Sequence, residues 1–160
     1  MARVSVIKGV WETKDEVSAL FDEMRIIPDD VQKAMLQAEG DVIAAKQRQT
    51  AQSMLTVNTG NYIDTKHGII THIKVGKMKR SRNENMFHTD VIFTGTQHGV
   101  RRAAIAFMNE YGALHMGKGS FTGRAWKQPP RPFIQTAINQ ASNKAVAAAE
   151  EIFFNWLDIL

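Results

Sequence analysis

Apolar residues recur at helical spacing in three stretches of the chain. The first follows Thr13, which forms a capping box with Glu16 and predicts a short helix. The second extends from Pro28 to about Met54, and Gly40 in its interior weakens the helix by about 1 kcal/mol relative to alanine without ending it. The predicted buried stripe of this second helix is Val31, Met35, Ala38, Val42, Ala45 and Gln49.

The third helical stretch begins at Pro132, whose missing N–H suits the first turn of a helix. Its predicted buried face is Ile134, Ile138, Ala141, Ala145, Ala148, Ile152 and Trp156, with Trp156 in the core. The shorter segment 101–112 is ambiguous. Phe107 and Tyr111 suit a short helix that Gly112 would close, and a third strand is the alternative.

β-Branched and aromatic residues mark the predicted strands. A short strand is expected over 4–10, and turn residues follow at 58–61. The segments 68–78 and 85–95 flank a polar, charged stretch and predict a long antiparallel hairpin.

Two loops stand out in this pattern. Residues 112–131 contain four glycines, two adjacent prolines and four basic residues, and we expect a long, exposed, mobile loop there. A second mobile loop is expected at about 78–86. The whole pattern predicts one α+β domain over residues 1–160: a small antiparallel sheet with a long basic hairpin, packed by a long helix from the N-terminal half and by a C-terminal helix.

Composition narrows the classes of site that the chain could hold. The sequence has 160 residues and no cysteine, which excludes disulfides, thiolate metal sites and thiol nucleophiles. No apolar run approaches the ~20 residues that span a bilayer, and the first residues lack the apolar stretch of a signal peptide. We therefore expect synthesis in a cytosol and no membrane partner.

Positive charge is concentrated in the middle of the chain. Residues 74–131 carry 11 Lys and Arg against 3 Asp and Glu, whereas the flanking regions are slightly acidic. Such a patch suits nucleic acid or an acidic protein surface, and a solvated face is the alternative. The candidate residues for contact with a partner or with DNA are Lys77, Lys79, Arg80, Arg82, Lys118, Arg124, Trp126 and Lys127, with Trp126 as a possible interface anchor in the loop.

One stretch resembles a nucleotide-binding loop. Gly112 to Lys118 reads G-x-x-x-x-G-K, but Gly119 stands where a P-loop needs Ser or Thr to hold Mg²⁺. Prolines downstream also forbid the helix whose N-terminus would face the phosphates. We therefore attribute the match to the glycine-rich composition of this stretch and do not predict a nucleotide-binding site.

No other constellation predicts catalysis. The five histidines lack metal-ligand spacing, a nucleophile elbow is missing, and the adjacent carboxylate pairs Asp29–Asp30 and Glu150–Glu151 diverge on helices. We expect no catalytic residue, no metal and no cofactor, and hence no enzyme.

Three short stretches, taken in order, carry a resemblance. "NTGNYIDT" at 58–65 follows the long helix, "IAFMNEYG" at 105–112 follows the sheet, and "QPPRPFIQTAI" at 128–138 opens the last helix. This order resembles the phage neck and tail-completion proteins, the head–tail joining and minor tail components of long-tailed phages. The matching structural residues are Thr59, Gly60, Glu110, Gly112, Arg131, Pro132 and Phe133.

The resemblance implies a structural virion protein, made in the bacterial host cytoplasm and located at the neck or tail end. It would form a ring of identical copies, expected to be a hexamer, that completes the tail and joins it to the head connector. The implied partners are further copies of the chain, the head connector, stopper or portal-proximal proteins, the tail terminator or tail tube protein, and DNA in the channel. The alternative is a small basic nucleic-acid-binding protein acting in the host cell.

Overall fold

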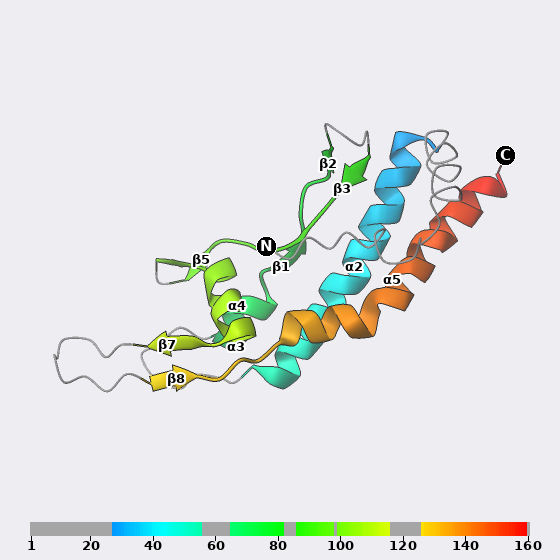
Figure 1. Ribbon diagram of the computed structural model, residues 1–160. Helices are drawn as coiled ribbons and strands as arrows, with labels where there is room; N and C mark the ends of the chain where they lie inside the picture. Colours follow the sequence, from blue (N-terminus) through cyan, green and yellow to red (C-terminus); the bar gives the residue numbers. More distant parts are fainter. Residues whose placement is uncertain (1–26, 56–64, 82–85, 98, 116–125, 160) are drawn as a thin grey trace. The chain divides into compact units, whose positions relative to one another are not determined.

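The computed structural model describes residues 27–55, 65–81, 86–97, 99–115 and 126–159 (Figure 1). The predicted strand at 4–10, the capping-box helix and the turn at 58–61 lie outside the described residues. The elements are α2 (Asp29–Met54), α3 (Thr65–Ile70), β1 (Ile73–Val75), β2 (Lys79–Arg80), β3 (Phe87–His88), β4 (Val91–Phe93), β5 (Thr96–Gln97), β6 (Val100–Arg101), α4 (Arg102–Tyr111), β7 (Ala113–His115), β8 (Trp126–Gln128) and α5 (Phe133–Leu157).

Long helices and short antiparallel strand pairs make up the fold, which confirms the predicted α+β class. The described strands pair as β1 with β4, β2 with β3, β5 with β6, and β7 with β8. The longest helices are α2 and α5, one in the N-terminal half and one at the C-terminal end, as the apolar pattern predicts.

The chain divides into two compact units. The first contains 1–43, 75–91 and 141–160, and the second contains 44–74 and 92–140. Two of the boundaries between the units fall inside the continuous helices α2 and α5, so the units are not separate segments of the chain. The single domain expected from the sequence stays a prediction.

Helix α2 begins and ends where the sequence predicts, but its buried face differs from the predicted stripe. The Pro28 carbonyl accepts the first helical hydrogen bond from the Gln32 N–H, and the helix continues through Gly40 to Met54. Ala45 and Gln49, expected inside, are exposed, whereas the buried positions in the described helix include Gly40, Ile43, Ala44, Gln47, Thr50 and Ala51. The predicted stripe is rotated away from this face, because it includes Ala45 and Gln49 and omits Gly40, Gln47 and Thr50.

The predicted hairpin forms, but it starts later than expected. Residues 65–70 are the helix α3 and not strand, because this turn buries Ile69 completely and packs α3 on α4. Burial of Ile69 here outweighs its β-propensity. Pairing then runs from the His72 carbonyl, which accepts from the Thr94 N–H at 3.0 Å, to the Ser81 N–H, which donates to the Met86 carbonyl at 2.7 Å.

The segments expected to be ambiguous or irregular have regular structure in part. Residues 102–111 are the helix α4, closed by Gly112, and not a third strand. The expected loop at 112–131 is wrong at both of its ends, where β7 pairs with β8 in the register Leu114↔Lys127. Backbone pairing there satisfies the amides that an irregular loop would leave to solvent.

Helix α5 begins one residue after the predicted start. Pro132 precedes it, and its carbonyl accepts from the Thr136 N–H at 3.0 Å, so Pro132 is the N-cap residue. Ala141 and Ala145 are buried as predicted. Trp156, predicted as core, is half-buried and lies with its ring centroid 5.9 Å from that of Phe153. The Trp156 indole is therefore packed against the Phe153 ring but is not fully buried.

The first unit contains a carboxylate with a perturbed proton affinity. Burial raises the pKa of Glu39, which lies next to Gly40 in α2. Desolvation disfavours the charged form of such a group, so ionised Glu39 opposes folding of this unit at neutral pH.

Gly40→Ala tests the close approach of α2 to β1. A Cβ on Gly40 would lie 2.9 Å from Cγ1 of Val75, a side chain that is stiff at χ1. Alanine gains about 1 kcal/mol of helix propensity, but overpacking costs about 1–3 kcal/mol, so a net loss of unfolding free energy is expected. Urea unfolding measures it.

The control for this prediction is Val75→Ala, which opens the space. In that background Gly40→Ala should raise the unfolding free energy by about 1 kcal/mol, because only the propensity gain remains. A stabilising effect of Gly40→Ala in the wild-type background would contradict the packing argument.

Candidate functional site

In the second unit, two of the stretches that carry the family resemblance meet. Glu110, at the end of α4, is 6% exposed, and its side chain reaches the first turn of α5. Its Oε2 accepts from the Ile134 N–H at 2.8 Å and its Oε1 from the Gln135 N–H at 2.9 Å. A carboxylate here satisfies two backbone donors that have no intrahelical partner, and it complements the positive end of the helix dipole.

The backbone beside Pro132 completes this cap. The Phe133 N–H donates to the Arg131 carbonyl at 2.8 Å, and the ring nitrogen of Pro132 carries no proton. Every N–H of the α5 entry from Phe133 to Gln135 therefore has an acceptor. Phe133 is completely buried, and its ring packs edge-on against Phe93 with centroids 6.1 Å apart.

Asn109, the residue before Glu110, ties the same junction together. Its carbonyl accepts from the Arg131 N–H at 2.6 Å, and its Oδ1 accepts from Nε2 of Gln128 at 2.9 Å. Its own amide donates to the Ile105 carbonyl at 2.9 Å. Since Asn109 is buried, these bonds satisfy polar atoms that would otherwise be costly to enclose.

Gly112 is required by geometry where α4 passes into β7. Its φ is 80°, and a Cβ would lie 2.7 Å from the Gln128 carbonyl oxygen. Both the left-handed backbone and the close approach exclude a side chain. Gly112 thus positions the β7–β8 hairpin against the segment that leads into Arg131.

On α2, Thr50 contacts the same entry from the other side. Its Oγ1 donates to the Phe133 carbonyl at 2.9 Å. Sequence reasoning missed Thr50, Asn109 and Gln128. Thr50 falls among polar neighbours in α2, and only the position of Asn109 beside Glu110 gave a signal that could have found it.

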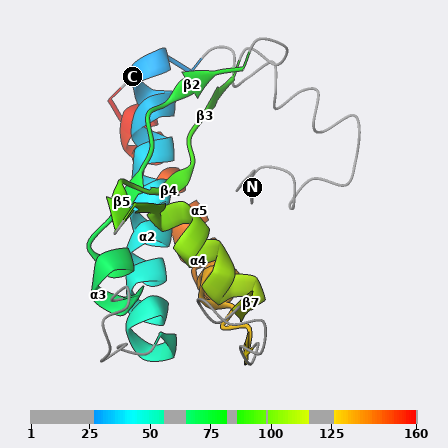
Figure 2. The same ribbon diagram turned by 90° about the vertical axis from the view of Figure 1, so that its left-hand side faces the viewer.

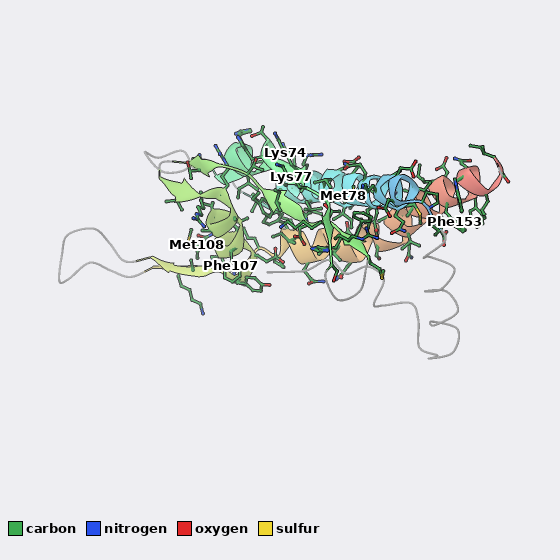
Figure 3. All side chains as sticks on the ribbon, turned by 90° about the horizontal axis from the view of Figure 1, so that it is seen from above. Lys74, Lys77, Met78, Phe107, Met108 and Phe153 are labelled. Carbon is green, nitrogen blue, oxygen red and sulfur yellow. The ribbon has the colours of Figure 1, made fainter. Side chains whose placement is uncertain are left out.

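The basic part of the hairpin, which contains Lys77, Lys79 and Arg80, belongs to the first unit. All three side chains are exposed on it, with Lys79 opposite His88 and Arg80 opposite Phe87. Figure 2 shows β2 and β3 side by side. Figure 3 shows Lys77 and Met78 on this hairpin. The three cations form a surface that an anionic partner could approach.

The Phe87 ring holds the hairpin against the start of α2. Nζ of Lys33 lies 4.7 Å and Cζ of Arg80 5.4 Å from the ring centroid. Arg80 also pairs with Asp29, with Nη1 and Oδ2 3.7 Å apart and both side chains half exposed. Such an exposed pair contributes little stability, but it lowers the net positive charge that Arg80 presents.

The remaining candidate residues do not gather into one site. Lys127 is exposed on β8, and Trp126 is a strand residue and not part of an irregular loop. Arg82, Lys118, Arg124, Thr59 and Gly60 lie outside the described residues. The structure therefore brings together Glu110, Gly112, Arg131, Pro132 and Phe133, and places Lys77, Lys79 and Arg80 in the other unit.

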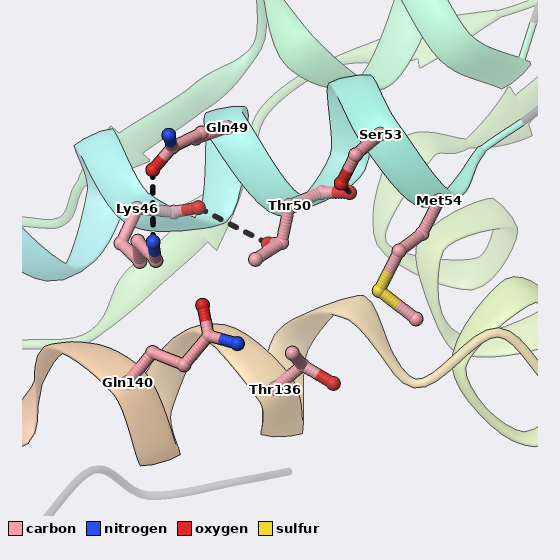
Figure 4. A pocket seen from close by; sticks show the side chains of 7 residues that line it. All are labelled: Lys46, Gln49, Thr50, Ser53, Met54, Thr136 and Gln140. Atoms are coloured by element: carbon pink, nitrogen blue, oxygen red, sulfur yellow. Dashed lines mark hydrogen bonds between the residues drawn. The ribbon is translucent and has the colours of Figure 1, made fainter.

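An open cavity of about 420 Å³ lies between α2 and α5 in the second unit (Figure 4). Its lining residues are Lys46, Gln49, Thr50, Ser53, Met54, Thr136 and Gln140. The Lys46 ammonium donates to Oε1 of Gln49 at 2.9 Å. The lining offers no carboxylate or imidazole for proton transfer.

Metal-ligating side chains do not cluster in the described part of the chain. The described residues contain no group of three or more His, Asp or Glu side chains able to hold a metal ion. Within the same ranges, each helix is too short or too polar to cross a membrane.

Glu110→Gln should destabilise the protein by about 1–3 kcal/mol, because an amide accepts through one oxygen only and its NH₂ group would face a backbone N–H. Guanidinium unfolding measures the change. Gln135→Ala is the control: it keeps the capped backbone N–H and removes an exposed side chain whose amide donates to Oδ1 of Asn139 at 2.9 Å. Unfolding of Glu110→Gln at the wild-type denaturant concentration would show that the cap contributes nothing.

We compared the chain with known protein families, curated proteins and solved structures. No known protein family, no curated protein and no solved structure matches the chain. The resemblance to phage neck proteins therefore stays a prediction.

Proposed function

We propose that this chain is a structural protein of a tailed phage virion. It forms a ring of identical copies at the neck or tail end, completes the tail and joins it to the head connector. Its partners are further copies of itself, a connector or stopper protein on the head side, and a terminator or tube protein on the tail side.

The cap of α5 is the observation that carries this proposal. The Glu-aromatic-Gly stretch and the Arg-Pro-Phe stretch are separated by the 18 residues between Gly112 and Arg131, yet Glu110 bonds directly to the helix that Phe133 begins. The two motifs thus act as one structural unit, which supports reading them as a set and not as separate coincidences.

The surface chemistry also favours a role in assembly over catalysis. Three of the four buried polar side chains in the described residues, Glu110, Asn109 and Thr50, are bonded to backbone and shape the fold, and the fourth is the amide of Gln47. Large apolar side chains, among them Phe107, Tyr111 and Phe154, are instead exposed. Exposed aromatic side chains are typical of protein contacts.

A host-cell nucleic-acid-binding protein remains the second candidate, and the exposed Lys77 and Lys79 on the β2–β3 hairpin favour it. In this alternative the monomer would bind DNA with a steep dependence on salt concentration. Within the neck proposal, the same cations would contact DNA in the channel or an acidic partner surface.

Deletion of the gene from its phage, followed by electron microscopy of the particles, tests the neck role. We expect DNA-filled heads and finished tails that remain separate, because the joint is missing. Missing or misterminated tails would place the same protein earlier in tail assembly. Normal infectious particles would refute a virion role and leave the nucleic-acid-binding alternative.

The triple variant Lys79→Ala, Arg80→Ala, Arg82→Ala tests the hairpin as a DNA-binding surface. If these side chains meet phosphates, the slope of log affinity against log salt should fall by about 1 for each phosphate that the variant no longer neutralises. Fluorescence anisotropy with duplex DNA measures the slope. The matched control is Lys66→Ala, Lys127→Ala, Lys144→Ala, which removes the same charge elsewhere; an unchanged slope in the hairpin variant would exclude this role.

A further inference from the structure

The described helix α4 has an unusual distribution of side chains between its two faces. The buried face contains Ile105 and Ala106 together with the polar residues Asn109 and Glu110. The exposed face is entirely apolar or aromatic: Ala103, Ala104, Phe107 and Tyr111. Since water disfavours such a face, it is a candidate for contact with another molecule.

Two aromatic rings dominate this exposed face of α4, which we call the α4 face. Phe107 is 57% and Tyr111 65% exposed, and their ring centroids are 4.6 Å apart. Figure 3 labels Phe107 on α4. The rings contact each other one helical turn apart, so they present one continuous apolar surface.

A second exposed apolar surface lies at the end of α5, in the other unit. Phe154 is 57% and Leu157 41% exposed, and Ile159 beyond the helix is 84% exposed. Phe153, labelled in Figure 3, supports Phe154 with ring centroids 5.7 Å apart. Exposed Glu150, Glu151 and Asp158 flank these side chains, and we call this surface the α5 face.

The two faces carry opposite charge. The described residues of the second unit, which holds the α4 face, include eight Lys and Arg, and the sole described acidic residue there is the buried, capping Glu110. The described residues of the first unit, which holds the α5 face, include five Lys and Arg against eight Asp and Glu. Two exposed basic side chains lie on the segments that flank α4: Arg101 directly before the helix, and Lys127 on β8, which pairs with β7 directly after it.

We infer that the α4 face of one copy binds the α5 face of a second copy of this chain. Each face is apolar at its centre and charged at its rim, with opposite signs, so aromatic burial and charge attraction favour the same pairing. Pairing of two α4 faces would instead bring like charges together, which disfavours a symmetric dimer through this helix.

The contact joins unlike surfaces, so each copy keeps one free α4 face and one free α5 face. Repetition of such a heterologous contact closes into a ring when the rotation permits, and otherwise grows into a filament. The inference rests on the proposed function only for closure into a ring. The contact itself follows from the two faces.

Mixing two variants tests the pairing by analytical ultracentrifugation of the full chain. The first variant is Phe107→Ala with Tyr111→Ala, and the second is Phe154→Ala with Leu157→Ala. The wild-type chain should form species larger than a dimer as concentration rises. Each variant alone should associate about thirtyfold more weakly or worse, because truncation of interface anchors has effects of this size.

The equimolar mixture is the decisive sample. One intact α4 face and one intact α5 face remain between the two variants, so the mixture should form a one-to-one dimer and nothing larger. A monomeric wild-type chain, a variant that still forms the large species, or a mixture that stays monomeric would each overturn the inference. Ile92→Thr, which alters an exposed apolar residue outside both faces, should leave association unchanged.

Charge reversal provides a second, independent readout in case truncation disturbs folding, which circular dichroism would detect. Arg101→Glu with Lys127→Glu should weaken association, and so should Glu150→Lys with Glu151→Lys. The chain carrying all four changes should associate as the wild type does, because both rims then have reversed charge and still attract each other. Loss of association in the fourfold variant would overturn the charge argument.

These outcomes are separable from failure of the proposed function. A one-to-one dimer in the mixture, together with normal particles from the gene deletion, would support the contact and refute the neck role. Separated heads and tails from the deletion, together with a monomeric mixture, would support the neck role and refute this contact.

Discussion

The second unit depends on one carboxylate that is enclosed by protein. Glu110 closes the N-terminus of α5 from the end of α4, so two helices distant in the sequence share a pair of hydrogen bonds. The neighbouring contacts support this one: Asn109 holds the Arg131 backbone, and Thr50 binds the Phe133 carbonyl. Removing the carboxylate would leave the Ile134 and Gln135 N–H groups facing a buried site without an acceptor.

The sequence predicts the elements of this fold better than it predicts their contacts. Periodicity locates α2 to its last residue and indicates the hairpin, because both signals depend on local spacing. The buried face of α2 escapes prediction, since Gly40 is inside only because Val75 approaches it from a distant strand. Helix α3 is not predicted for a related reason. Its two isoleucines favour a strand locally, but packing of α3 on α4 buries Ile69 and stabilises a helix.

The candidate site shows the same division. Glu110, Gly112 and Phe133 could be selected from sequence because they belong to the short motifs that carry the resemblance. Their relationship could not be selected, because the bond from Glu110 to Ile134 spans 24 residues. The exposure of the α4 aromatic rings could not be predicted either. Phe107 and Tyr111 match a helical stripe in the sequence, but only the structure shows that this stripe faces solvent while Asn109 and Glu110 are buried.

The β7–β8 hairpin has a consequence for the order in which the chain folds. Pairing of Ala113 with Gln128 brings the end of α4 next to the prolines that precede α5. Before that pairing, joining Glu110 to Ile134 requires closure of a long, flexible loop, whereas afterwards a few residues on each side remain to be ordered. Hairpin closure therefore reduces the entropic barrier to capping, and α5 is expected to nucleate late, on a template that α4 and the hairpin have already formed.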